Sequence, residues 1–314
     1  MALSSVKVTV NGQEYTLTLN TSTGKYEGTI TAPSQSSGSN NSGSGPGIGS
    51  AASGKGYYPI TVTATDDHGN VTTKDASDSS LGTSLRLKVL EKTVPTAAVT
   101  YPTAGATITN SKPSIAFKFT DSGSGINPSS CYIKVDSGSW TKVTVSGSGT
   151  TYTGTYTPSS ALSDGSHSIQ VKTTDYDGNE GTSTAVSFKV DTAPPALSIS
   201  SPLTGAKLNT KSINLVGSTS DVTSSPVTVS ATLNGTDVGT ISVASDGSFS
   251  KTLTGIEGTN TIIVTATDSA GQKSTQTITI SIDVTPPVIS GVTVTPNPSS
   301  TGATVTISVT VTDA

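Results

Sequence analysis

Three segments of the chain alternate apolar and polar residues for six positions and then reach an aspartate and a glycine-containing turn. The segments are 60–66, 169–175 and 262–268. Strict alternation over this length predicts a half-buried strand, because successive side chains of a strand point to opposite faces of the sheet. A strand-and-turn pattern that occurs three times in one chain indicates a repeat array.

A second recurring pattern joins an acidic residue, a proline and a later strand. Glu91, Asp191 and Asp283 each precede a Val-Pro or Pro-Pro pair, and 30 positions after each of them a strand-like segment ends at an aspartate. Proline ends one sheet and stiffens the connection to the next. Short strands bounded by turns at this spacing predict an all-β chain of tandem immunoglobulin-like β-sandwiches. The later aspartates are Asp121, Asp221 and Asp313.

Two short sequence motifs resemble those of a known class of repeats. With Asp-Val-Thr-Pro-Pro at 283–287 and Thr-Ala-Thr-Asp-Ser-Ala-Gly at 265–271, the chain resembles the tandem bacterial Ig-like and cadherin-like repeats of surface fibres, adhesins and phage appendages. The resemblance implies a location outside the cell, on a cell surface or on a virion. The first residues, 1–5, have neither the basic nor the apolar region of a secretory signal.

The repeats divide the chain into two complete and two partial sandwiches. Residues 93–191 and 192–284 contain a full set of predicted strands. Residues 1–92 begin with a strand that aligns with the third strand of the complete copies, so this part holds strands C to G. A Ser/Gly/Asn-rich tract at 34–56 predicts a flexible insert within it. Residues 285–314 supply only strands A and B.

The two partial sandwiches are complementary, which predicts how copies of the chain join. A sandwich without strands A and B exposes a core groove and unpaired sheet edges, whereas two strands alone are marginally stable in water. We therefore expect strands A and B of one copy to complete the N-terminal sandwich of the next and polymerise the chain head to tail. The predicted subunit-interface residues are Val6, Val8, Val10, Val305, Ile307, Val309 and Val311.

A second interpretation treats the ends as arbitrary points in a longer array. The chain is then an Ig-like spacer, or a carbohydrate- or receptor-binding segment, of a larger adhesin or phage tail protein. A glycan or a cell-surface receptor replaces a second copy as the partner. Four aromatic residues are the candidates for a sugar-stacking strip, although an aromatic side chain after a turn more often covers a sheet edge. They are Tyr132, Trp140, Tyr152 and Tyr156.

Acidic residues gather at one predicted pole of each sandwich, where the B–C loop, the F–G loop and the incoming linker meet. Hard cations take six to eight oxygen ligands, and clustered acids at a domain junction are similar to the calcium sites of cadherin-like arrays. Calcium is therefore the candidate cofactor, and aspartates that only cap turns are the alternative. The candidate ligands are Asp66, Glu91, Asp121, Asp175, Asp177, Asp191, Asp221, Asp268, Asp283 and Asp313.

The composition of the chain argues against several classes of function. Charged residues make up 12% of the 314 positions and the formal net charge is −4, so the chain has no basic footprint for nucleic acid. No apolar stretch approaches the ~18 residues of a membrane span. Two histidines and one cysteine leave little for nucleophilic or zinc chemistry, and the sequence has no Gly-x-Ser-x-Gly, His-Glu-x-x-His or P-loop motif. We expect a structural protein and no enzyme.

Overall fold

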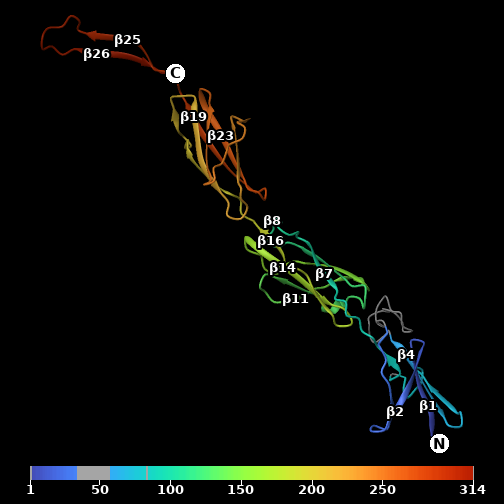
Figure 1. The fold of residues 1–314 in the computed structure, drawn as a ribbon. Coiled ribbons are helices and arrows are strands. Elements are labelled where there is room, and N and C mark those ends of the chain that lie inside the picture. Colours follow the sequence, from blue (N-terminus) through green and yellow to red (C-terminus); the bar gives the residue numbers. More distant parts are fainter. Residues whose placement is uncertain (1, 34–56, 83, 314) are drawn as a thin grey trace. The chain divides into compact units, whose positions relative to one another are not determined.

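The computed structural model describes residues 2–33, 57–82 and 84–313, so the insert predicted at 34–56 lies outside the described residues. The described part consists of strands and one short 3₁₀ helix, η1 (Pro128–Ser130). The predicted all-β fold is confirmed. The chain divides into two compact units, residues 1–190 and 191–314 (Figure 1).

The first sheet belongs to the N-terminal part of the first unit. Its strands are β1 (Leu3–Val10), β2 (Gln13–Asn20), β3 (Lys25–Glu27), β4 (Tyr58–Asp66), β5 (Val71–Lys74) and β6 (Arg86–Leu87). The strand order is β3-β2-β1-β4-β5, and β6 pairs with β4. Asn11 and Gly12 connect β1 to β2 with φ angles of +51° and +74°. Positive φ at both positions suits a tight hairpin, which explains the Asn-Gly pair there.

Residues 96–190 form a sandwich of two sheets. Its strands are β7 (Thr96–Tyr101), β8 (Thr107–Ile108), β9 (Ile115–Thr120), β10 (Tyr132–Val135), β11 (Thr141–Lys142), β12 (Ser146–Ser148), β13 (Thr151–Tyr156), β14 (Gly165–Thr174), β15 (Glu180–Thr182) and β16 (Val186–Val190). One sheet has the order β12-β13-β9-β7, and the other has β11-β10-β14-β16-β8 with β15 on β14. Alternate residues of β9 point inward, so Phe117 and Phe119 share one core with Ile133 and Val171.

The second unit contains a sandwich of the same kind. Its strands are β17 (Ala196–Ser201), β18 (Lys207–Leu208), β19 (Ser212–Ser220), β20 (Thr228–Leu233), β21 (Thr236–Asp237), β22 (Ser248–Thr254), β23 (Gly258–Thr267) and β24 (Lys273–Ile282). The sheets have the orders β17-β19-β22 and β18-β24-β23-β20-β21. Ile213 and Leu215 of β19 are fully buried in one core with Ile262 and Val264 of β23.

Two further strands in the second unit, β25 (Val288–Thr295) and β26 (Thr306–Thr312), form a separate antiparallel pair (Figure 1). Among the described residues neither strand pairs with a third strand. Direct cross-strand partners are Ile289 with Val311 and Val292 with Val309. The alternation of the sequence therefore gives this ribbon one apolar face, and every residue of both strands is exposed.

Strands β1 and β4 of the first sheet pair in the same register as strands β10 and β14 of the sandwich at 96–190. Val8 on β1 faces Val62 on β4, as Ile133 on β10 faces Val171 on β14. In the sandwich, β7 and β9 lie over this face, and Ile133 and Val171 are at most 1% exposed. The described residues 3–87 form a single sheet, and in it Val8 and Val62 stay half-buried.

His167 on β14 is a buried titratable group inside the sandwich at 96–190. Burial alone would lower its pKa, but two hydrogen-bonding partners raise the pKa above its ordinary value of 6.5. Its Nδ1 lies 2.8 Å from the Asp136 carboxylate, and its Nε2 lies 2.7 Å from the Ser163 carbonyl oxygen. The protonated ring donates to both acceptors, so the folded state favours the charged form.

We expect the first unit to lose stability as the pH rises above about 6.5 and through the raised pKa of His167. The loss should be on the order of 1 kcal/mol, the net contribution of a typical intramolecular hydrogen bond. Thermal melts between pH 5.5 and 8.5 measure it, with His167→Gln removing the dependence. His68→Gln, at an exposed histidine, is the control and should leave the dependence intact. A wild-type melt that is flat across this range would contradict the assignment.

Candidate functional site

A first cluster of carboxylates lies in the first unit. Glu91 belongs to the linker between β6 and β7, Asp121 follows β9 and Asp175 follows β14. One oxygen from each side chain lies within 4.8 Å of the other two. All three residues are buried, at 5% exposure or less.

The hydrogen bonds of this first cluster leave two of its oxygens open. Glu91 Oε1 accepts the Ser124 amide, and Asp121 Oδ2 accepts the Gly125 amide at 2.5 Å. Glu91 Oε2 and Asp121 Oδ1 are buried and, within the described chain, accept no hydrogen bond. A side-chain carbon at Gly123 would overlap the Glu91 carboxylate, so glycine there lets the linker acid reach the loop.

A second cluster, in the second unit, repeats this arrangement. Asp191 precedes β17, Asp221 follows β19 and Asp268 follows β23, and one oxygen of each again lies within 4.8 Å of the others. Asp191 Oδ2 and Asp268 Oδ2 are buried without a hydrogen bond from any described residue, as is the Ser224 hydroxyl. Asp221 is half-buried, and its Oδ1 accepts the amides of Thr223 and Ser224 at 2.8 and 2.6 Å.

The F–G turns of both clusters have one hydrogen-bonding pattern. The carboxylate of Asp175 accepts the Asn179 amide at 2.8 Å, and that of Asp268 accepts the Gln272 amide at 2.9 Å. The side-chain amide of each partner also reaches the linker. Asn179 Nδ2 donates to the Glu91 carbonyl at 3.3 Å, and Gln272 Nε2 donates to the Asp191 carbonyl at 2.9 Å. These turns therefore hold the linker acid beside the loop acids.

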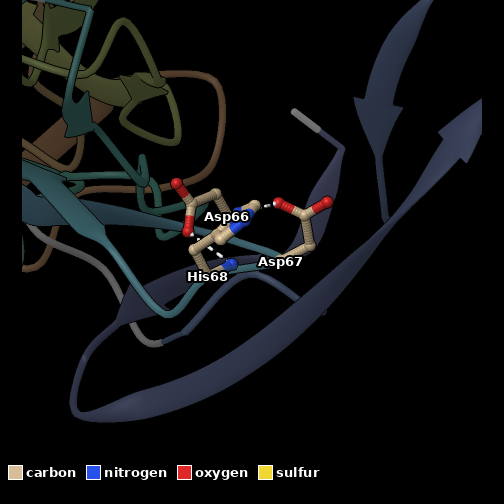
Figure 2. A group of neighbouring side chains, drawn as sticks. All are labelled: Asp66, Asp67 and His68. Atoms are coloured by element: carbon tan, nitrogen blue, oxygen red, sulfur yellow. Dashed lines mark hydrogen bonds and ion pairs between the residues drawn. The ribbon is translucent and has the colours of Figure 1, made fainter.

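A third copy of the turn ends β4. Asp66 accepts the Asn70 amide at 2.8 Å, and the Asn70 side chain holds the pKa of the Asp66 carboxyl below its ordinary value. Figure 2 shows Asp66 beside Asp67 and His68, with His68 donating its backbone amide to Asp66 and its ring 2.8 Å from Asp67. This group is largely exposed, and its hydrogen bonds are those of a capped turn.

Charge repulsion is strong in the two buried clusters. Two charges at 4.8 Å, the upper limit for the separation of the cluster oxygens, repel by about 3.5 kcal/mol at an effective dielectric constant of about 20. Burial, with further contributions from Asp121 and Asp175, raises the pKa of Glu91 above its ordinary value. Of the six acids, none forms an ion pair with a described lysine, arginine or histidine. Each cluster needs protons or a cation for charge balance.

The other predicted ligands lie elsewhere. The side chain of Asp177 is fully buried beside the first cluster, where Oδ2 accepts the Glu91 amide at 3.0 Å and Oδ1 lies 3.4 Å from Lys88. It positions the linker. Asp283 is exposed and accepts the Thr285 amide at 3.0 Å. Asp313, just after β26, is exposed as well. The groups of nearby acids in the described chain include neither Asp283 nor Asp313.

Two kinds of residue at these clusters were missed from the sequence, although both have a signal in it. Ser124 and Ser224 each lie three positions after the B–C aspartate, in Asp121-x-x-Ser and Asp221-x-x-Ser. The F–G aspartates are each followed four positions later by Asn70, Asn179 or Gln272. Repeated spacing of a polar residue from an acid was thus the available signal.

The four aromatic residues proposed as a sugar-stacking strip do not lie on one surface. Tyr152 and Tyr156 pack against the core of the sandwich at 96–190. The Trp140 ring instead has the ammonium groups of Lys134 and Lys172 at 5.1 and 5.0 Å from its centroid. Trp140 therefore makes cation–π contacts over β10 and β14. These contacts favour the sheet-covering alternative for Trp140, because its ring lies by lysines of the β10–β14 sheet whereas Tyr152 and Tyr156 belong to β13 of the other sheet.

Comparison with protein families gives two matches along the chain. Residues 91–192 match the model described as "Bacterial Ig-like domain", and residues 195–284 match "Glucodextranase, domain B". Bacillopeptidase F of Bacillus subtilis (strain 168) is 29% identical over 138 residues, which are 44% of this chain and 9% of that protein. The match thus spans less than a tenth of this curated relative.

Solved structures similar to the chain include several tandem β-sandwiches. The fibronectin(III)-like modules of CbhA from Clostridium thermocellum are 16% identical with a TM-score of 0.35, covering 60% of this chain and 94% of that one. Immunoglobulin domains 1–4 of Sidekick-1 are 10% identical with a TM-score of 0.38, covering 74% and 60%. Likeness at this level concerns the fold alone. In the described residues no helix has the length and apolar character needed to cross a membrane.

Proposed function

The chain is a tandem Ig-like repeat protein, and from this premise we propose that it is a structural subunit of an extracellular fibre. Strands β25 and β26 of one copy complete the N-terminal sheet of the next, so that copies join head to tail. Ig-like domains are typical of extracellular proteins. The observation that carries the proposal is a pair of complementary apolar faces, one on the β25–β26 ribbon and one on the N-terminal sheet.

The donor face of this contact is the apolar side of the β25–β26 ribbon. Its side chains are 38–66% exposed, although they are as apolar as a sandwich core. Val309 and Phe117 each lie four residues before the aspartate that follows their B strand. Ile307 and Ile115 each lie six residues before it, so the two strands align. The face consists of Ile289, Val292, Val294, Ile307, Val309 and Val311.

The acceptor face is the apolar side of the N-terminal sheet. Its register on β1 and β4 equals that of β10 and β14, over which β7 and β9 lie in the sandwich at 96–190. A second pair of A and B strands would fit this face in the same way. The face consists of the half-buried residues Val8, Tyr15, Leu17, Ile60, Val62 and Ala64, together with Val6 and Val10, which are already buried within the chain.

Energetics favour the contact. Full burial of a Val or Ile side chain contributes roughly 1.5–3 kcal/mol, so six such residues on the donor face give a gross stabilisation on the order of 10 kcal/mol. Association costs about 4–15 kcal/mol in lost freedom, and the half-buried residues of the acceptor face add their own burial. The contact therefore has enough apolar surface for stable joining of copies, while a two-stranded ribbon alone is marginal.

Light scattering on the full chain at rising concentration tests the proposal, together with electron microscopy. We expect filaments for the wild type and monomers for Val309→Asp, which places a charge on the donor face. The matched control is Ser308→Asp, on the polar side of the same strand, which should still assemble. A wild-type chain that stays monomeric at high concentration would refute the fibre function.

A second candidate function is that of an Ig-like spacer within a larger surface protein. It is favoured by the match to Bacillopeptidase F, of which the chain spans 9%. In that case the strands that cover β25 and β26 come from the same polypeptide. Extension of the reading frame beyond Ala314 by a set of C to G strands, together with a monomeric product, would support this function.

A further inference from the structure

We propose that each of the two buried carboxylate clusters binds one hard divalent cation, with calcium as the best fit. The clusters are Glu91, Asp121 and Asp175 in the first unit and Asp191, Asp221 and Asp268 in the second. The bound ion fastens the linker acid to the B–C and F–G loops of the sandwich that follows it. This inference concerns the joints of the array and stands independently of how copies join.

Open buried oxygens point to a ligand. Glu91, Asp121, Asp191 and Asp268 are at least 95% buried, and each has one carboxylate oxygen that accepts no hydrogen bond from the described chain. Each belongs to a cluster in which the three residues bring oxygens within 4.8 Å of one another. The Ser224 hydroxyl, 2% exposed, is a further open oxygen beside Asp221. Buried polar atoms are almost always satisfied, and an isolated buried charge is costly. A cation would satisfy these oxygens and balance the charge together.

The donor set selects the class of ion. All the ligating atoms are oxygens, and neither cluster contains histidine or cysteine, which zinc and copper prefer. Oxygens bound to one Ca²⁺ at 2.3–2.6 Å can lie up to about 5 Å apart, whereas those of Mg²⁺ span about 4 Å. Cluster oxygens within 4.8 Å of one another lie inside the span of one Ca²⁺, and a site built from several protein carboxylates suits Ca²⁺ better than Mg²⁺, which usually keeps several of its waters. Half-buried Asp221 leaves a side open to water ligands.

The loops are arranged to hold the linker acid in place around the ion. Asn179 and Gln272 bind the linker carbonyls of Glu91 and Asp191, while their backbone amides bind the F–G aspartates. Each loop therefore already holds the linker by neutral hydrogen bonds. A cation adds the attraction that offsets the repulsion between the linker carboxylate and the loop carboxylates.

Calorimetric titration with CaCl₂ tests the proposal on the full chain after chelator treatment, in the Val309→Asp background so that assembly contributes no heat. We expect two ions per chain, with the affinity near 10⁻⁴–10⁻³ M that is known for extracellular calcium modules. At a hundred times the dissociation constant, calcium should raise the melting temperature by about 5–10 °C. Magnesium at equal concentration should give a clearly smaller shift.

Isosteric variants locate the sites. Asp268→Asn should reduce the stoichiometry from two ions to one, and Asp121→Asn should remove the other ion. Asp237→Asn, at an exposed turn aspartate that caps Gly239, is the matched control and should keep both. In chelator, Asp268→Asn should melt no lower than the parent, because the amide removes a repelling charge; this separates lost binding from lost folding.

Three outcomes would overturn the proposal. They are a melting temperature unchanged by calcium, two ions still bound by Asp268→Asn, and an equal response to magnesium, which would remove the calcium preference. If the chain does not form fibres, these measurements keep the same meaning, because they use the Val309→Asp variant, which is designed not to assemble.

Discussion

Mixing two variants, each blocked at one end, should yield dimers and nothing longer. Val309→Asp charges the donor face of β26, and Val8→Asp charges the acceptor face of β1. Alone, each variant lacks one half of every contact and stays monomeric. Together, the intact ribbon of the second variant meets the intact sheet of the first, and the dimer has no further competent end. Sedimentation velocity measures the outcome directly.

The mixture is a stringent test because misfolding cannot mimic it. A misfolded variant contributes no competent end, so dimers appear only when both chains keep their intact face. Thr63→Asp, on the other face of β4 opposite Lys7, is the matched control for Val8→Asp and should still assemble. If both blocked variants are folded and the mixture remains monomeric, strand exchange between copies is wrong.

Phe117→Ala should destabilise the first unit by about 3–5 kcal/mol, the range for a large buried aromatic residue. Phe117 is 1% exposed, and a side-chain carbon at Gly154 would come within 2.7 Å of its ring. Removing the ring therefore leaves a cavity beside a glycine that cannot fill it. Chemical denaturation measures the change. Lys118→Ala, exposed on the other face of β9, should change stability by less than about 0.5 kcal/mol.

The corresponding change on the ribbon should behave differently. Val309 holds the position of Phe117 in its strand but is 50% exposed. In a monomeric chain, Val309→Ala should therefore have almost no effect on unfolding. In assembled filaments it should weaken the contact between copies, seen as a higher concentration needed for assembly. An equal effect in monomer and filament would mean that the ribbon is buried within its own chain.

Alternation along the sequence was sufficient to predict the strands, because burial of one face leaves a period of two that any reader can detect. It also predicted that linker, B–C and F–G acids converge, since the sandwich brings these three connections to one pole. The alternation of apolar and polar residues could not predict which individual side chains belong to each cluster. Asp177 has the spacing of a ligand, yet its carboxylate binds the Glu91 amide and lies near Lys88.

Local turn geometry explains what the pattern left out. Ser224 lies beside Asp221 because the amides of residues 223 and 224 both donate to the Asp221 carboxylate. Gly123 admits Glu91 because it has no side chain. Such details depend on backbone torsions in loops, where a binary pattern of polar and apolar residues carries no information. Trp140 is separated from Tyr152 and Tyr156 because it lies by lysines of the β10–β14 sheet, whereas the two tyrosines belong to β13 of the other sheet.

The turn at 66–70 has the hydrogen bonds of the two loops proposed to bind a cation, but in the proposed fibre its linker and B–C acids, Asp283 and Asp313, come from a second copy. A third ion would then be bound only where copies meet. Thermodynamic linkage makes this coupling reciprocal: calcium lowers the critical concentration for assembly by the same factor by which assembly tightens calcium binding. Fibre length would accordingly follow the calcium activity of the surroundings, and a chelator would shorten fibres without altering any strand.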